Sequence, residues 1–163
     1  MIKSPAIWCL LTISVLIAIS AGSTRAQRAP TTIMIVSGRD SGLAINAWGG
    51  AQNGVILRLH NSCRPGNLDC TWIFRDGMLL SARDQRLAIT AWGGARYGTE
   101  LRLAQGCNPN NPAFTWTFSN GMFISKGDSK LAINAWGGAL HGTVLKLHNA
   151  CKPTNPDCKW IQK

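Results

Sequence analysis

The chain has 163 residues and a formal net charge of +10, from 17 Lys and Arg against seven Asp and Glu. This length suits one domain with a core large enough to be stable without help, and the charge is basic without being extreme. The acidic residues are one Glu (Glu100) and six Asp, and no two of them recur as an acid and base pair, so we expect no enzyme.

Residues 1–26 are predicted to be a secretory signal peptide. Lys3 supplies a positive charge, residues 6–19 form an apolar run, and Ala26 ends a cleavage motif. The run is short for a membrane span, so an uncleaved anchor is the less favoured alternative. We therefore expect an exported domain over residues 27–163, secreted outside the cell or into a periplasm, where cysteines pair.

A threefold repeat organises residues 31–163. LAINAWGGA at residues 43–51 returns as LAITAWGGA at 87–95 and as LAINAWGGA at 131–139, a constant step of 44 residues without insertion or loss. We number the units one, two and three. They span about residues 31–74, 75–118 and 119–163, and such a period indicates a repeat architecture.

Each unit is predicted to contain four strands, because short apolar or alternating runs are separated by turn residues. In unit one the runs are residues 33–37, 43–48, 56–60 and 71–75. Asp76-Gly77 and Asn120-Gly121 lie between the apolar runs of successive units and predict type I′ hairpins. The chain ends where a third such turn would follow, so we expect the ends of this twelve-stranded domain to meet and close a ring.

Alternation along the second strand predicts which side chains face the core. Leu43, Ile45 and Ala47 fall on one side of the strand, and Asn46 and Trp48 on the other, non-core side. The fourth strands are expected to turn five aromatic side chains into the core: Trp72, Phe74, Trp116, Phe118 and Trp160.

Three tandem four-stranded units, each with a polar residue on the second strand, a Gly-containing turn and a Trp opening the fourth strand, resemble the ricin-type (R-type) β-trefoil lectins. The resemblance covers the whole of residues 27–163 and implies an all-β, β-trefoil fold that binds carbohydrate. The Gln-x-Trp signature of that family is altered here, because Cys70, Phe114 and Cys158 stand in the place of the Gln.

The family's sugar site implies three positions in each unit: an Asp at the end of the second strand, an aromatic residue on the third, and a polar residue just before the Gln place. These positions hold Asn46, His60 and Asp69 in unit one, Thr90, Ala104 and Ala113 in unit two, and Asn134, His148 and Asp157 in unit three. No unit has the family's complete set, so the usual galactose preference does not carry over.

The three units act as controls for one another. A requirement of the fold would hold in every unit, whereas these positions stay polar in units one and three and lose their site chemistry together in unit two. A local binding role explains this better than drift on a solvated surface. We therefore predict two carbohydrate sites, made of Asn46, Trp48, Arg58, His60 and Asp69 in unit one and of Asn134, Trp136, Lys146, His148 and Asp157 in unit three.

The chemistry of these residues suits a sugar, although each has a plainer interpretation. Amide, carboxylate and cationic groups bond hydroxyls, and an indole offers an apolar face to a sugar ring. Trp48 and Trp136 have a counterpart, Trp92, in the unit that lost the other residues, which favours a structural role. His60 and His148 could equally be solvated strand residues.

Two local disulfides are predicted, Cys63–Cys70 and Cys151–Cys158. Each would close a loop that carries Asp69 or Asp157, worth about 2 to 3 kcal/mol on the chain-entropy model. Cys107 faces Phe114 where its partner should be, so we expect a buried free thiol rather than a dimer bridge. The spacing disfavours a zinc site, and we expect no metal and no cofactor.

A binder of anionic polymers is the rival interpretation. Arg58, Arg102 and Lys146 keep a positive charge at one place in every unit, suited to sulfated or sialylated glycans, acidic surfaces or nucleic acid. Their threefold spacing spreads the charge around a ring rather than along a stripe, which disfavours nucleic acid. The same charges could simply keep the protein soluble, and a protein-binding trefoil, such as an inhibitor or a toxin subunit, stays open as a third possibility.

Overall fold

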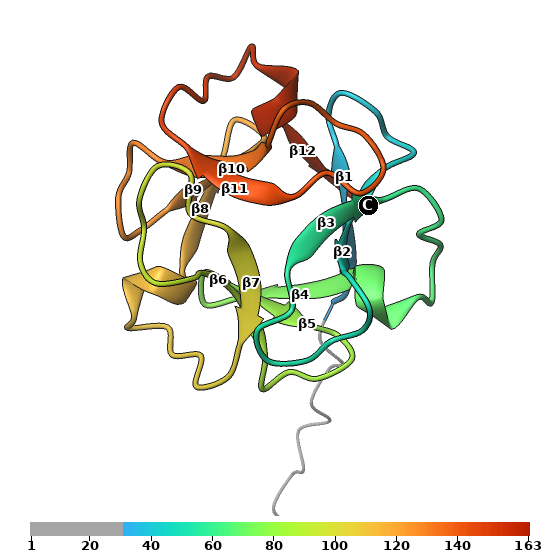
Figure 1. The fold of residues 1–163 in the computed structure, drawn as a ribbon. Coiled ribbons are helices and arrows are strands. Elements are labelled where there is room, and N and C mark those ends of the chain that lie inside the picture. Colours follow the sequence, from blue (N-terminus) through green and yellow to red (C-terminus); the bar gives the residue numbers. More distant parts are fainter. Residues whose placement is uncertain (1–30) are drawn as a thin grey trace, which may run out of the picture.

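The computed structural model describes residues 31–163, which form twelve β-strands and three short 3-10 helices (Figure 1). Unit one contains β1 (Ile33–Ser37), β2 (Ala44–Ala47), β3 (Leu57–His60), η1 (Leu68–Cys70) and β4 (Thr71–Arg75). Unit two contains β5 (Met78–Ser81), β6 (Ala88–Ala91), β7 (Leu101–Ala104), η2 (Pro112–Phe114) and β8 (Trp116–Ser119). Unit three contains β9 (Met122–Ser125), β10 (Ala132–Ala135), β11 (Leu145–His148), η3 (Pro156–Cys158) and β12 (Trp160–Gln162). The predicted signal peptide lies outside the described residues.

The twelve predicted strands are confirmed, and the 3-10 helices are an addition. Each helix follows an asparagine whose side-chain oxygen accepts from the backbone N–H two residues on, at Asn67, Asn111 and Asn155. A three-residue helix is too short to leave a helical period in the sequence, so the pattern of apolar residues could not reveal it. None of the helices within residues 31–163 is long and apolar enough to cross a membrane.

Six strands form a closed barrel around the threefold axis. β1 pairs with β4 and β12, β4 pairs with β5, and β8 pairs with β9, all antiparallel. A bridge between Met78 and Thr115 joins β5 to the segment leading into β8. The N–H of Trp160 donates to the carbonyl of Gly121 at 2.7 Å and joins β12 to the start of β9. The barrel therefore has no free strand edge around its circumference.

The turns and ends that close this barrel match the prediction. Asp76 and Gly77 have φ angles of 54° and 79°, and Asn120 and Gly121 have 50° and 75°, the positive values that a type I′ turn requires at both positions. Met34 and Lys163 exchange backbone hydrogen bonds of 2.8 and 2.9 Å, so the two ends of the domain meet.

Three hairpins, β2–β3, β6–β7 and β10–β11, cap one end of the barrel (Figure 1). Bridges beside their second strands meet around the axis and pair Ile56 with Arg102, Arg58 with Val144, and Glu100 with Lys146. A six-stranded barrel capped by three hairpins is the β-trefoil, so the predicted fold class is confirmed.

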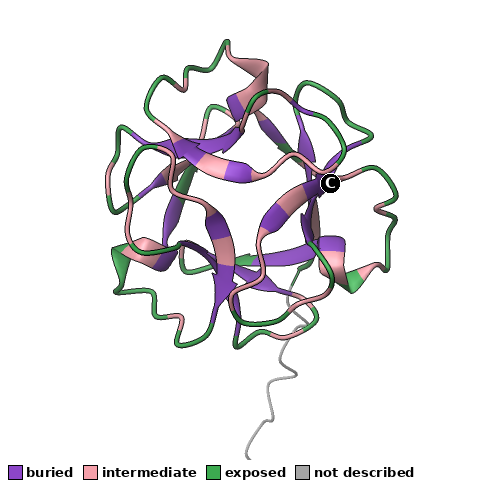
Figure 2. Cartoon of the chain, in the orientation of Figure 1, coloured by how far each residue is buried: buried purple, intermediate pink, exposed green. Residues whose placement is uncertain are grey.

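The core joins the barrel to the cap (Figure 2). Trp72, Trp116 and Trp160 are buried as predicted, and their indole N–H groups donate to the carbonyls of Ile45, Ile89 and Ile133 at 3.2, 3.3 and 3.0 Å. A buried indole N–H needs a hydrogen-bond partner, and here the partner is a carbonyl of the second strand. Each bond therefore links a barrel strand to the hairpin of its own unit. The cap hairpins that carry the predicted sites are thereby held in one position.

Two predictions about side-chain direction are wrong. Phe74 and Phe118 are 37% and 36% exposed, because they lie at the uncapped end of the barrel, where their rings pack on Phe123 at 5.8 and 4.6 Å between centroids. Asn46, expected on a non-core face, is only 7% exposed. The 3-10 helix η1 packs against β2 and covers the face that alternation had assigned to solvent.

Candidate functional site

The varying position on the second strand of each unit fastens that strand to the 3-10 helix. Asn46 and Asn134 donate their side-chain amides to the sulfurs of Cys70 and Cys158, each at 3.3 Å. Thr90 donates its hydroxyl to the carbonyl of Ala113 at 3.0 Å. All three side chains are buried. Asparagine occurs in units one and three, which have a disulfide whose sulfur accepts the bond, and threonine occurs in unit two, which has none.

The predicted disulfides Cys63–Cys70 and Cys151–Cys158 are both present. Cys107 is free and half-buried rather than fully buried, with its sulfur 3.5 Å from the carbonyl oxygen of Arg86. The loop that carries Cys107 has no disulfide, unlike the equivalent loops of units one and three. Across residues 31–163, no three His, Cys, Asp or Glu side chains gather as metal ligands.

Each predicted site aspartate forms an ion pair with an arginine from the neighbouring unit. The guanidinium of Arg83, from the loop after β5, donates to both oxygens of Asp69 at 2.6 and 3.0 Å. Arg39, from the loop after β1, donates through Nε and Nη2 to both oxygens of Asp157, the latter at 2.8 Å. The hydrogen bonds that each arginine donates to the carboxylate, and the charge of the carboxylate, raise the pKa of the arginine.

Sequence reasoning missed these arginines, although a signal was present. Arg39 and Arg83 are 44 residues apart, and the next step leads to Gly127 in the loop after β9. Arginine is thus lost at the boundary where Ala113 replaces the aspartate. A Cβ atom on Gly127 would lie 3.0 Å from the Cβ of Ala95, so a side chain at this position would crowd the loop after β6.

A cluster of three aromatic rings forms the other side of each predicted site, and one of its rings comes from the preceding unit. Trp48 lies 5.5 Å from His60 and 5.3 Å from His141 of unit three, measured between ring centroids. In unit three the corresponding cluster contains Trp136, His148 and Tyr97, with centroid distances from 5.2 to 5.7 Å. Tyr97 and His141 were not among the predicted site residues.

The equivalent position facing unit two is Asn53, whose side-chain oxygen accepts from the backbone N–H of Gln105 at 3.0 Å. Trp92 therefore has neither the histidine nor the second aromatic ring that Trp48 and Trp136 have. Compared with units one and three, unit two therefore lacks four side chains: the strand histidine, the aspartate, its arginine and the aromatic ring from the neighbouring turn.

The three cations of the cap stack on the three tryptophans in every unit. Arg58, Arg102 and Lys146 place their charged groups 5.6, 5.5 and 5.2 Å from the ring centroids of Trp48, Trp92 and Trp136. Because the contact is kept in unit two, it does not depend on the other site residues, which that unit has lost.

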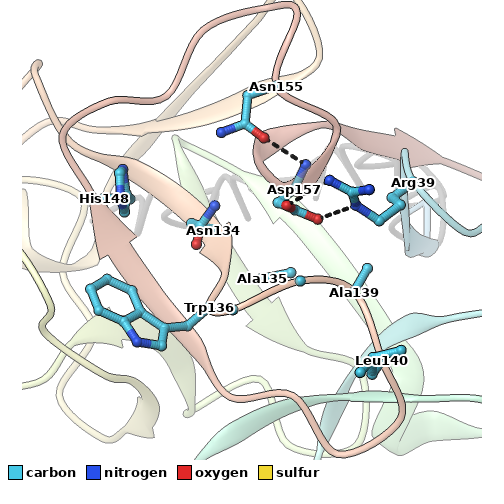
Figure 3. A pocket seen from close by; sticks show the side chains of 11 residues that line it. Arg39, Asn134, Ala135, Trp136, Ala139, Leu140, His148, Asn155 and Asp157 are labelled. Carbon is cyan, nitrogen blue, oxygen red and sulfur yellow. Dashed lines mark hydrogen bonds and ion pairs between the residues drawn. The ribbon is translucent and has the colours of Figure 1, made fainter.

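A cavity of about 680 Å³ opens at the predicted site of unit three (Figure 3). Figure 3 shows Trp136 and His148 on one side, Arg39 and Leu140 on the other, and Asn134 between them. Four of the five predicted residues of unit three line the cavity, namely Asn134, Trp136, His148 and Asp157, whereas Lys146 does not. The lining also includes Arg39, Asn155, Leu140 and the backbone of residues 135–139. The site is therefore composite, since Arg39 belongs to unit one.

No family model matches the sequence, and a search of curated proteins finds no relative. Solved structures of similar fold include the C-half of an earthworm R-type lectin in complex with GalNAc, with 18% identity over 82% of this chain and 98% of that one and a TM-score of 0.67. The agglutinin of Abrus precatorius matches with 19% identity over 84% of this chain and 49% of that one, with a TM-score of 0.68.

A designed threefold symmetric protein, ThreeFoil, matches with 10% identity over 80% of this chain and 96% of that one, with a TM-score of 0.67. The chain spans only 17% of the length of a mosquitocidal holotoxin, at 12% identity over 82% of this chain and a TM-score of 0.68. These likenesses confirm the structural resemblance to the R-type β-trefoil lectins, and at such identities they show the fold alone.

Proposed function

We propose that this protein is a secreted carbohydrate-binding protein that acts by binding rather than by catalysis, with sites in units one and three. The observation that carries the proposal is the composite cavity of unit three, where Trp136, His148, Asn155 and the pair Arg39–Asp157 surround one space. An indole beside polar groups suits a sugar, whose ring has an apolar C–H face and hydroxyl edges.

The parallel between the units supports two sites. Units one and three share the histidine, the aspartate with its arginine, and the aromatic ring from the neighbouring turn, and unit two lacks them all. Solved lectins of the same fold contain bound sugars, GalNAc in the earthworm lectin and N-acetyl-D-lactosamine in the trefoil lectin of a Vibrio vulnificus hemolysin. Two weak sites on one domain would gain affinity for a dense glycan surface through multivalency.

Export of the domain is part of the proposal. The predicted signal peptide and two disulfides in residues 31–163 both suit an oxidising compartment outside the cytosol. Appearance of the mature chain in the culture medium or periplasm of an expressing cell would support it, and retention of the full-length chain inside the cell would contradict it.

The three tryptophans provide a matched test of the sites. Trp48→Ala, Trp136→Ala and Trp92→Ala remove the same ring from equivalent places, and each loses the same cation contact. On a panel of immobilised neutral and acidic glycans, we expect weaker binding for the first two variants and unchanged binding for Trp92→Ala.

Equal losses in all three variants, with equal losses of stability, would restrict the tryptophans to the fold and count against the two sites. Failure of the unmodified protein to bind any glycan would overturn the proposal. Binding that falls steeply with salt and depends equally on Arg58, Arg102 and Lys146 would instead favour a binder of anionic polymers.

A further inference from the structure

The carboxylate in the unit-three cavity is paired with an arginine. Arg39 donates to both oxygens of Asp157 and uses about half of the hydrogen-bond positions that the carboxylate offers. The carboxylate is also the recessed partner, because its side chain is 18% exposed and that of Arg39 is 48% exposed. Within residues 31–163, Nη1 of Arg39 makes no hydrogen bond, and it leaves two N–H donors at the cavity.

The neighbouring side chains also present donors. Asn155 accepts the N–H of Asp157 with its side-chain oxygen at 3.0 Å, which leaves the amide NH₂ as its free group. His148 accepts the N–H of Ala150 on Nδ1 at 2.9 Å, so the neutral ring carries its hydrogen on Nε2. The side-chain oxygen of Asn134, a residue only 6% exposed, is an acceptor in addition to the carboxylate. Among the side chains of the cavity, the free donors therefore outnumber the free acceptors.

Unit three also has a cation in the cap whose charged group has no polar partner within residues 31–163. Arg58 donates to the carbonyl of Gly142 at 2.9 Å, and Arg102 pairs with Glu100 at 2.8 Å. Their counterpart Lys146 has no hydrogen bond or ion pair to any part of the chain that the structure describes, and it lies opposite Asn134 across the β10–β11 hairpin. Its charge adds to the positive potential at this end of the domain.

We propose that the unit-three site selects saccharides that carry an anionic oxygen group, either a carboxylate or a sulfate ester. This inference rests on the proposed carbohydrate binding and names its ligand class. The anionic group accepts from Nη1 of Arg39 and from the Asn155 amide, while the uncharged ring lies against Trp136. A neutral sugar gains less from these donors, because it has no anionic oxygen to form a charge-assisted hydrogen bond with Arg39.

The test compares saccharides that differ only in the anionic group. The mature protein is titrated by calorimetry with lactose, with sialylated lactose and with sulfated lactose, at low and at physiological salt. We expect at least one acidic form to bind about tenfold more tightly than lactose, the effect of one charge-assisted hydrogen bond. Binding of only one acidic form would identify the anionic group as a carboxylate or a sulfate.

Substitution of Arg39 provides the variant that tests the site. In a Trp48→Ala background, where the unit-one site is weakened, Arg39→Gln should reduce the preference for the acidic form to a ratio near one. In the same background Arg39→Lys, which keeps the charge without the planar fork, should give an intermediate ratio. Arg86→Gln is the matched control, because it removes one positive charge from an exposed pair with Asp84 and should leave the ratio unchanged. Thermal unfolding of each variant identifies any that has failed to fold.

The possible outcomes separate this inference from the proposed function. Lactose binding as tight as that of both acidic forms overturns the inference and leaves carbohydrate binding standing. A preference that Arg39→Gln retains, or that Arg86→Gln reduces equally, overturns it as well, because general surface charge would then explain the effect. Absence of binding to every saccharide overturns both proposals.

Discussion

Asn134 on β10 donates its side-chain amide to the sulfur of Cys158 at the end of η3, across 3.3 Å of buried space. The same contact joins Asn46 to Cys70 in unit one. Position 46 and its counterparts therefore attach the second strand to the segment that carries the site aspartate. We therefore expect these hydrogen bonds to affect binding through the placement of that segment.

Asn134→Ala is expected to lower the free energy of unfolding by about 1 kcal/mol, the usual net value of one buried hydrogen bond. Urea denaturation followed by tryptophan fluorescence measures the change. Thr90→Ala, which removes the equivalent bond in unit two, should have a similar effect. A loss of glycan binding by Asn134→Ala with no change in stability would show that this amide contacts the ligand directly.

The disulfides should affect the sites more than the fold. Replacing Cys151 and Cys158 by Ser opens a short loop and should cost about 2 to 3 kcal/mol on the chain-entropy model. The serine at 158 still offers Asn134 an acceptor, so the variant isolates the effect of the loop. Because that loop carries Asp157, we expect unit three to lose affinity even where the domain remains folded.

Calorimetry under conditions where the variant is fully folded measures this loss of affinity, and denaturation measures the cost to stability. The equivalent replacement of Cys63 and Cys70 serves as the comparison for unit one. Retention of full affinity in a folded variant would show that the loop keeps its position without the bridge.

Much of the fold was predictable because the repeat makes each strand signal occur three times and the Asp-Gly or Asn-Gly turn signal occur twice. The Asp76-Gly77 turn and the buried Trp72 depend on local sequence and on a period of two, both of which are visible in the chain. The burial of Asn46 was not visible. A polar residue on the outward face of a strand is normally exposed to solvent. The sequence contained no helical period that would have predicted η1, which covers this face.

The composite nature of the sites was the other missed feature. Comparison of equivalent positions shows which residues vary together, but it does not show which unit's loop faces which unit's strand. Arg39 meets Asp157 because the ends of the domain close the ring, and Tyr97 meets Trp136 because the cap hairpins lean on one another. These contacts depend on the offset between units, which only the assembled barrel defines.

One ion pair away from the unit-three cavity gives a prediction about pH. Hydrogen bonds from the side chain and backbone of Arg86 hold the pKa of Asp84 below its ordinary value. A carboxylate whose pKa is lowered by folding stabilises the fold above the unfolded pKa, and this contribution disappears as the pH falls through the folded pKa. Arg86→Gln removes the side-chain bonds, so it should raise the pKa of Asp84 toward the ordinary carboxyl value.

An NMR titration of the Asp84 carboxyl carbon in both proteins measures this shift. The backbone N–H of residue 86 also donates to Asp84, at 3.0 Å, and it is kept in the variant, so the return should be partial. An identical titration in the two proteins would mean that the ion pair is not formed in solution.

Rebuilding unit two is the most direct test of the two-site arrangement. Ala104→His, Ala113→Asp and Gly127→Arg restore the strand histidine and the aspartate–arginine pair, and Asn53→Tyr restores the aromatic ring from the preceding unit. Since Trp92 and Arg102 are already stacked as in the other units, the rebuilt unit should bind a third saccharide. Calorimetry should then report three sites per chain in place of two.

The rebuilt unit has one foreseeable steric conflict. A side chain at Gly127 brings its Cβ within 3.0 Å of the Cβ of Ala95, so the loop after β9 must move outward before the new arginine can reach the aspartate at 113. The variant without Gly127→Arg therefore serves as the control, and it should keep two sites. A folded fourfold variant that still binds only two saccharides would show that these four side chains are insufficient to make a site, and that the difference between the units lies in the bridged loop.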